Sequence, residues 1–302
     1  MSKSHYMALS TIPGVGGVTA RKLLERFGSL QGAFAALDDE LLSVPRVTPE
    51  IVAGMREADL DGLEEGLEAL DREGIAVLTW EDDGYPANLL EARDSPYLLY
   101  AVGELRPEDS YAVAVVGSRE ASAKSMEIAE RVARELAEQG VTVVSGLAEG
   151  IDTAGHVGAL AASGGRTIAV LGSGLAAIHP RENTSLAEQI AERGAVVTEY
   201  APRVTVRGPQ LMARDRIVSG LSRAVVVVEA RVQSGSLDTA DKARKQDRIV
   251  FAVPGSPGTD ALIASGAISF DPNSGVEEII RRISQERKPT SEQPSLWDSS
   301  PD

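Results

Sequence analysis

Between residues 111 and 253, short runs of β-branched and small apolar residues alternate with longer amphipathic segments. Each run is apolar at every position, which is typical of parallel strands buried on both faces. The predicted strands are 112–116, 141–144, 167–171, 195–198, 224–228 and 249–253. The helices predicted around and between them are 122–139, 150–163, 183–193, 209–221 and 236–246. This alternation predicts an α/β fold with a doubly wound, extended Rossmann-like parallel sheet.

The chain on either side of this region has a different pattern. Residues 1–57 indicate short helices joined by tight turns, so we expect a small all-helical domain there. Its Gly14-Val15-Gly16 turn resembles a helix-hairpin-helix, which can present turn amides to a DNA backbone, although a small packing module fits equally well. Residues 58–110 are predicted to be a connector with one helix and an edge strand, and residues 111–283 the Rossmann-like domain. Residues 284–302 are rich in Ser, Pro, Glu and Gln, which predicts a disordered tail.

Composition narrows the classes of protein. The 302 residues are 43% hydrophobic and 25% charged, and no apolar run approaches the ~18 residues of a membrane span. The N-terminal residues have no apolar core for a signal peptide, so we expect a cytoplasmic protein. The absence of cysteine excludes disulfides, thiolate metal sites and a cysteine nucleophile. With three histidines in all, we expect no metal and no metal-based cofactor.

Charge is distributed unevenly along the chain. The net charge of -15 disfavours nucleic acid as a partner, because phosphate binding depends on cations that displace counterions. Residues 203–248, however, carry 10 Lys and Arg against 5 Asp and Glu. Such a basic block either is a solvated surface or attracts a polyanion locally, since charge acts over a Debye length of about 10 Å.

Small polar residues follow most of the predicted strands. Because the carboxyl ends of parallel strands meet at one edge of a sheet, the loops that follow them form a common rim. Glycine and serine in such loops expose backbone N–H groups near helix N-termini, which can hold phosphate without catalysis. The loops concerned include Gly117-Ser118-Arg119, Ser145-Gly146, Gly172-Ser173-Gly174, Ser234-Gly235-Ser236 and Pro254-Gly255-Ser256.

Several familiar catalytic motifs are missing. No G-x-G-x-x-G follows the first strand of the sheet, no P-loop occurs, and Ser118 and Ser145 lack a nucleophile elbow. His156 stands four residues after Asp152 on a predicted helix, a spacing that favours packing of the helix over activation of a serine. We therefore assign no catalytic residue and expect a protein that is not an enzyme.

Taken together, these loops resemble those of the DNA-processing protein A (DprA, also called Smf) family. The resemblance runs from about residue 8 to residue 270. Its motifs are Val115 to Arg119, Ser145 to Asp152 with His156, Pro180 with Asn183, Arg216 to Leu221, Val228 to Ala230, Ser234 to Leu237 and Val253 to Gly255.

The resemblance implies a homodimeric protein that binds single-stranded DNA, protects it and helps load the RecA recombinase during natural transformation or recombinational repair. It implies no cofactor. The residues expected to bind DNA phosphate are Gly117, Ser118, Arg119, Ser145, Gly146, Asn183, Arg214, Arg216, Ser234, Gly235 and Ser236. Where the family usually has Arg-Asn-Arg, this chain has Arg214-Asp215-Arg216, and the substituted acids Asp215, Asp238 and Asp260 subtract positive charge.

Two other functions are compatible with parts of the sequence. LOG-type (lysine-decarboxylase-like) phosphoribohydrolases, which handle nucleotides, have similar loops, but they need a glutamate near Pro254-Gly255, and none occurs between Glu229 and Glu277. The second is a scaffold that recruits a recombinase through its acidic surface.

A short motif near the C-terminus predicts a further partner. The segment that contains Gln293, Leu296 and Trp297 resembles the peptides by which replication and repair proteins dock into the sliding clamp. A chance match, or packing of Leu296 and Trp297 onto the protein's own surface, is the alternative.

Overall fold

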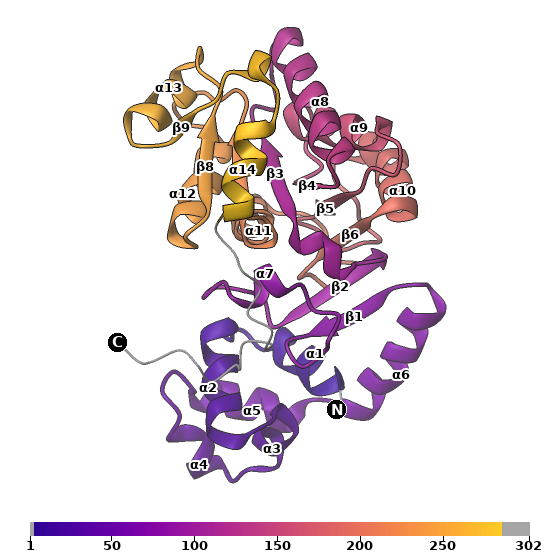
Figure 1. Ribbon diagram of the computed structural model, residues 1–302. Helices are drawn as coiled ribbons and strands as arrows, with labels where there is room; N and C mark the ends of the chain where they lie inside the picture. The colour runs from indigo at the N-terminus through magenta and orange to yellow at the C-terminus, as the bar shows by residue number, and fades with distance from the viewer. Residues whose placement is uncertain (1–2, 286–302) are drawn as a thin grey trace. The chain divides into compact units, whose positions relative to one another are not determined.

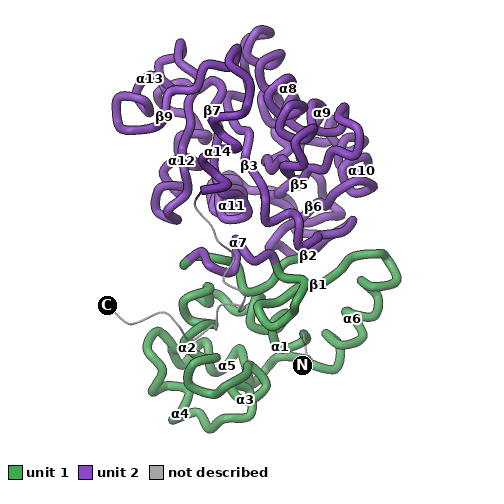
Figure 2. Tube along the Cα trace, viewed as in Figure 1, with its two compact units in different colours: residues 1–85, 93–99, 289–302 green, residues 86–92, 100–288 purple. Residues whose placement is uncertain are grey.

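The computed structural model describes residues 3–285, which form two compact units. Unit 1 holds residues 3–85 and 93–99, and unit 2 holds residues 86–92 and 100–285 (Figure 2). The boundaries therefore differ from those predicted at residues 57 and 110, because the connector is divided between the two units. Residues Ser284 and Gln285, predicted to begin the tail, belong to a helix. The clamp motif at Gln293, Leu296 and Trp297 lies outside the described residues.

Local contacts explain how the connector is divided. In unit 1, the Tyr85 hydroxyl donates a hydrogen bond to the carbonyl of Pro96, which ties residues 93–99 to that unit. In unit 2, the Asn88 side chain donates hydrogen bonds to the carbonyls of Ser110 at 2.8 Å and Leu221 at 2.9 Å. These bonds fix helix α7 (Ala87–Leu90) to unit 2.

Unit 1 contains the predicted all-helical domain. Side chains of Ser29, Thr48 and Asp59 accept hydrogen bonds from backbone N–H groups at three of its helix N-termini, as expected for such residues. Its helices are α1 (Lys3–Thr11), α2 (Gly17–Phe27), α3 (Leu30–Ala35), α4 (Asp38–Leu42), α5 (Pro49–Glu57) and α6 (Leu60–Arg72). Strand β1 (Ala76–Thr79) follows, where an edge strand was predicted.

Unit 2 is built on a mostly parallel sheet, which confirms the predicted fold class. The strands are β2 (Leu98–Gly103, in unit 2 from Tyr100), β3 (Ala112–Val116), β4 (Thr142–Ser145), β5 (Thr167–Val170), β6 (Ala195–Thr198), β7 (Ala224–Val227), β8 (Ile249–Ala252) and β9 (Ile268–Ser269). Their order is β2-β6-β5-β4-β3-β7-β8-β9. Strand β2 pairs antiparallel with β6, and the other pairs are parallel.

Helices cover both faces of this sheet (Figure 1). On one face α8 (Ala123–Glu138), α9 (Ile151–Ala161) and α14 (Glu277–Gln285) enclose a core with β3, β4, β7 and β8. On the other, α11 (Gly208–Leu221) packs against α12 (Gly235–Lys245). The remaining helices of unit 2 are α10 (Thr184–Arg193) and α13 (Pro257–Ala264), with 3₁₀ turns η1 (Pro107–Ser110), η2 (Arg181–Asn183) and η3 (Pro272–Ser274).

Among residues 3–285, no helix is both long enough and apolar enough to cross a membrane.

Candidate nucleic-acid interface

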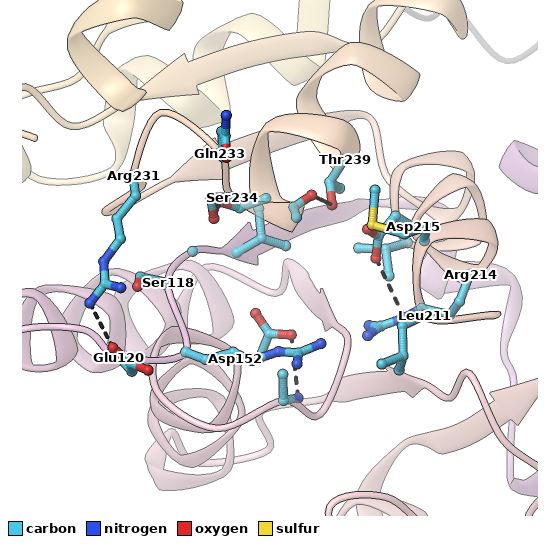
Figure 3. Close-up of a pocket in the computed structure, with 18 residues that line it drawn as sticks. Ser118, Glu120, Asp152, Leu211, Arg214, Asp215, Arg231, Gln233, Ser234 and Thr239 are labelled. Carbon is cyan, nitrogen blue, oxygen red and sulfur yellow. Dashed lines mark hydrogen bonds and ion pairs between the residues drawn. The ribbon is translucent and has the colours of Figure 1, made fainter. Parts of the chain in front are cut away.

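A cavity of about 350 Å³, here called the rim pocket, opens at the carboxyl edge of the sheet in unit 2 (Figure 3). The loops after β3, β4 and β7 line it together with one side each of α11 and α12. Its lining residues are Val116, Gly117, Ser118, Arg119, Glu120, Ala148, Asp152, Leu211, Met212, Arg214, Asp215, Val218, Arg231, Gln233, Ser234, Gly235, Ser236 and Thr239.

Most of the residues predicted to bind phosphate meet in this pocket. Seven of them line it, although they come from three separate parts of the chain: Gly117, Ser118, Arg119, Arg214, Ser234, Gly235 and Ser236. The other four lie outside the lining: Ser145, Gly146, Asn183 and Arg216.

Ser145 and Gly146 are buried next to the residues that line the pocket. Ser145 is fully buried, and its hydroxyl donates a 2.7 Å hydrogen bond to the carbonyl of Val115 in the neighbouring strand. A Cβ atom at Gly146 would lie 1.3 Å from Nη1 of Arg214. Glycine at this position therefore makes room for the Arg214 side chain, and neither Ser145 nor Gly146 is placed to touch a ligand.

Asn183 and Arg216 are also engaged elsewhere. The Asn183 amide donates hydrogen bonds to the carbonyl of Leu147 at 2.9 Å and to the hydroxyl of Thr153 at 2.8 Å, so it holds the loop after β4. The Arg216 guanidinium donates two 2.6 Å hydrogen bonds to the carboxylate of Glu199. This two-bond ion pair uses the charge that was predicted to face DNA.

Arg119 is one of the three arginines that line the pocket. It is exposed at the end of β3, and among residues 3–285 no hydrogen bond or ion pair of its guanidinium is found. Arg231, by contrast, forms a 2.7 Å ion pair with Glu120, and both side chains are exposed. Among the described residues, neither Glu149 nor Asp152 forms an ion pair with Arg119, so Arg119 stays available to an anion.

The N-terminus of α12 adds positive potential without a side-chain charge. Ser234, Gly235 and Ser236 line the pocket where this 11-residue helix begins, and unsatisfied N–H groups at a helix N-terminus attract anions. The hydroxyls of Ser234 and Ser236 lie 2.8 Å apart in a hydrogen bond. Backbone N–H donors and hydroxyls of this kind suit phosphate oxygens.

Asp152, Arg214 and Asp215 form a buried charged cluster in the wall of the pocket. Nε of Arg214 lies 3.5 Å from Oδ1 of Asp215, and these side chains are 5% and 12% exposed. Asp152 accepts hydrogen bonds from the N–H groups of Gly146 at 3.1 Å and Ala148 at 3.4 Å. Burial raises the pKa of Asp152, although the Arg214 charge and these hydrogen bonds oppose the shift. Asp215 lies inside α11, where it cannot cap the helix.

His156 has a structural environment, as the sequence favoured. It is fully buried, and its Nδ1 lies 2.7 Å from the Thr167 hydroxyl. That hydroxyl already donates to the carbonyl of Val143, so the imidazole Nδ1–H must be the donor. Burial, followed by the positive charge of Arg214, lowers the pKa of His156 to about 3. A neutral, enclosed imidazole joins helix α9 to strand β5.

A second hollow of about 790 Å³, here called the β5–β6 hollow, opens after strands β5 and β6. It contains His179, Arg181 and Arg203, all exposed, and no acidic residue lines it. These three residues were not predicted as site residues, and neither were Arg231 and Gln233 of the rim pocket. The sequence offered only one signal for Arg181 and Arg203, which is that each lies in the segment after a predicted strand.

Within residues 3–285, no group of three or more His, Asp or Glu side chains is arranged to hold a metal ion.

Comparison with known proteins identifies similar sequences and folds. Residues 76–283 match the family described as DNA recombination-mediator protein A, and residues 6–58 match the SAM-like helix-hairpin-helix tandem. Protein Smf of Synechocystis is 36% identical over 285 residues, which cover 92% of this chain and 70% of that protein. DNA processing protein DprA of Streptococcus pneumoniae is 43% identical over 192 residues, which cover 62% of this chain and 67% of that protein.

Two solved structures are also similar. The crystal structure of DprA from Streptococcus pneumoniae has a TM-score of 0.80 and 33% sequence identity, and the match covers 91% of this chain and 97% of that chain. A structure of DNA processing protein A from Helicobacter pylori, described as giving insights into its single-stranded DNA binding mode, has a TM-score of 0.62 and 29% identity. That match covers 69% of this chain and 96% of that one.

Proposed function

Because the chain belongs to the DNA recombination-mediator protein A family, which includes proteins named DprA and Smf, we propose that it binds single-stranded DNA at the carboxyl edge of its sheet. The observation that carries the proposal is the rim pocket, where the exposed guanidinium of Arg119 stands beside the N-terminus of α12. The Helicobacter pylori relative, whose described subject is single-stranded DNA binding, supports the same class of ligand.

The pocket is suited to holding a phosphate rather than to transforming it. Its donors are guanidinium groups, serine hydroxyls and backbone N–H groups, which position phosphate oxygens without reading base sequence. The buried His156 is neutral and enclosed, and hence no general base faces Ser118, Ser234 or Ser236 from that side. We therefore propose a binding protein without catalytic activity of its own.

The β5–β6 hollow extends the binding surface along the same edge. Strand β5 lies two strands from β3, a separation of about 10 Å at the usual spacing between strands. A few nucleotides span that distance, so a strand held at Arg119 can continue to Arg181 and Arg203. Since both arginines are exposed and lack acidic neighbours in the hollow, they add phosphate contacts to a protein that is acidic as a whole.

The description of the family as a recombination mediator supports a wider role. We propose that the protein passes a bound strand to the RecA recombinase during transformation or recombinational repair, and that it does so as a homodimer. Light scattering of the purified protein tests the dimer. Assembly of RecA on strands that are already coated tests the transfer.

Fluorescence anisotropy with labelled oligothymidylate tests the central proposal. With Arg119, Arg181 and Arg203 as phosphate contacts, log K should fall against log salt with a slope of about -2, at about 0.7 for each contact on a single strand. Unlabelled oligothymidylate should displace the probe, whereas thymidine monophosphate at the same phosphate concentration should not. Equal competition by the mononucleotide would favour a nucleotide-handling protein of the LOG type.

A further inference from the structure

Two of the three acidic residues that line the rim pocket form ion pairs with two of its three arginines. Asp215 contacts Arg214 inside the protein, and Glu120 contacts Arg231 at the surface. Figure 3 shows these two pairs on opposite sides of the pocket. A phosphate that enters the pocket therefore meets guanidinium groups that already have carboxylate partners.

The two pairs differ in their bonding. Arg231 donates a 2.7 Å hydrogen bond to Glu120. The contact between Arg214 and Asp215, at 3.5 Å, is an ion pair, and Nε of Arg214 has no hydrogen-bond partner among the described residues. Because Arg214 is 95% buried and lines the pocket, its guanidinium can offer this unused Nε donor to a ligand there. Phosphate oxygens are acceptors that match it.

We propose that Asp215 is the resident counterion of Arg214, and that a strand phosphate competes with the Asp215 carboxylate for this guanidinium. The charge of Asp215 then sets the affinity of the pocket for the strand. This inference rests on the proposed binding of single-stranded DNA. It adds that Asp215 weakens this binding and that the affinity depends on pH.

The surroundings of Asp215 determine the direction of that dependence. Helix α12 brings Lys242 and Asp238 near it, and Asp152 approaches from the start of α9. Burial raises the pKa of Asp215 to about 6, Arg214 and Lys242 oppose the rise, and the two other carboxylates add to it. His156, the remaining titratable group facing Arg214, stays neutral in this range because its pKa is lowered to about 3.

The sign follows from the charges. Above about pH 7, Asp215 is ionised and repels a phosphate, and below about pH 5.5 it is protonated and releases Arg214. Binding of a phosphate makes the ionised carboxylate less favourable, so the strand is bound with uptake of a proton. A rise of one unit in the pKa of Asp215 on binding corresponds to a gain of about tenfold in affinity between pH 7.5 and pH 5.

Glu120 provides a matched control. It is 78% exposed and belongs to the same pocket, so Glu120→Gln removes the same charge from a pair that solvent screens. Asp215→Asn removes the charge from the buried pair while nearly preserving the shape of the side chain. The control variant should bind strands more tightly by less than about threefold and should keep the dependence on pH.

The experiment measures the affinity for oligothymidylate by anisotropy between about pH 5 and pH 7.5 at constant ionic strength. Thymine has no group that titrates in this range. Histidine side chains commonly change charge in this range. The parent protein used here and all variants therefore carry His179→Gln, which removes the exposed imidazole of the β5–β6 hollow. Circular dichroism at each pH confirms that the protein is folded.

We expect the parent protein to bind about tenfold more tightly at pH 5 than at pH 7.5. Asp215→Asn should show the tight affinity at both values. If the parent binds strands with equal affinity across the range, the inference is wrong while the proposed function stands, and this result needs no variant. If Asp215→Asn keeps the pH dependence, another group is responsible and the inference is equally wrong. Absence of strand binding at every pH would overturn the proposed function and this inference with it.

Discussion

Glycine at position 158 is expected to fix the distance between helices α8 and α9. A Cβ atom built there would lie 2.0 Å from the carbonyl oxygen of Glu130 and 2.7 Å from its carbonyl carbon. Carbon and oxygen atoms in close contact are usually about 3.3 Å or more apart. Gly158→Ala therefore requires α9 to move away from α8 by roughly 1 Å, because a backbone carbonyl inside a helix cannot rotate aside.

A second glycine of the same helix separates the free-energy cost of this steric clash from the effect of helix propensity. Alanine is preferred to glycine in a helix interior by about 1 kcal/mol, and both Gly155 and Gly158 lie inside α9. The atoms nearest to a Cβ at Gly155 would belong to Val115, at 3.5 Å and beyond, which is ordinary contact. Gly155→Ala should raise the free energy of unfolding by about 1 kcal/mol. Gly158→Ala should lower it by about 2 kcal/mol, because overpacking of about 3 kcal/mol exceeds the gain in propensity.

Urea denaturation followed by circular dichroism measures both variants against the parent protein. The predicted difference between them is about 3 kcal/mol, well above the error of the method. Equal stability of Gly155→Ala and Gly158→Ala would show that α8 and α9 are not as close as described. Such a result would refute the reasoning, because propensity cancels between the two substitutions.

Three further predictions concern buried polar groups. The parent protein should lose stability as the pH falls from about 6.5 towards 3, because the unfolded chain protonates His156 while the folded chain does not. In denaturation experiments at several pH values, His156→Gln should lose less stability over this range. Asn183→Ala should lower the free energy of unfolding by about 1 to 2 kcal/mol, since it leaves a buried carbonyl without its donor. Asp109→Asn should lower the free energy of unfolding by about 3 kcal/mol, because Asp109 accepts hydrogen bonds from Arg166 and Thr142. An unchanged melting temperature would contradict this prediction.

The sequence predicts the central sheet well because its signal is local. All six predicted strands occur within one residue at each end, since runs such as 112–116 and 224–228 are apolar at every position. Strand β2 was assigned to the connector, because an antiparallel strand depends on a partner, β6, almost 100 residues away. Strand β9 has two residues, too few for any pattern.

The candidate site was predicted in part for a related reason. Topology alone brings Gly117 and Ser234 to one edge, so the rim could be located from the strand order. The hydrogen-bond and ion-pair partners of individual side chains could not be predicted, because they come from residues far apart in the sequence. Arg216 is paired with Glu199 from the end of another strand, and the hydroxyl of Ser145 donates to Val115 in its neighbour. In both cases the residue is polar, yet its polar group is already used within the fold.

The most direct test of the proposed strand-binding site compares Arg119→Ala with Arg134→Ala in anisotropy measurements over a range of salt concentrations. Arg119 lines the rim pocket, whereas Arg134 belongs to the C-terminal half of α8, towards the opposite edge of the sheet, and pairs with Glu138. Both variants lose one positive charge. We predict that Arg119→Ala weakens binding of oligothymidylate and reduces the magnitude of the slope of log K against log salt by about 0.7, while Arg134→Ala leaves that slope unchanged. Equal slopes for both variants and the parent protein would contradict the account.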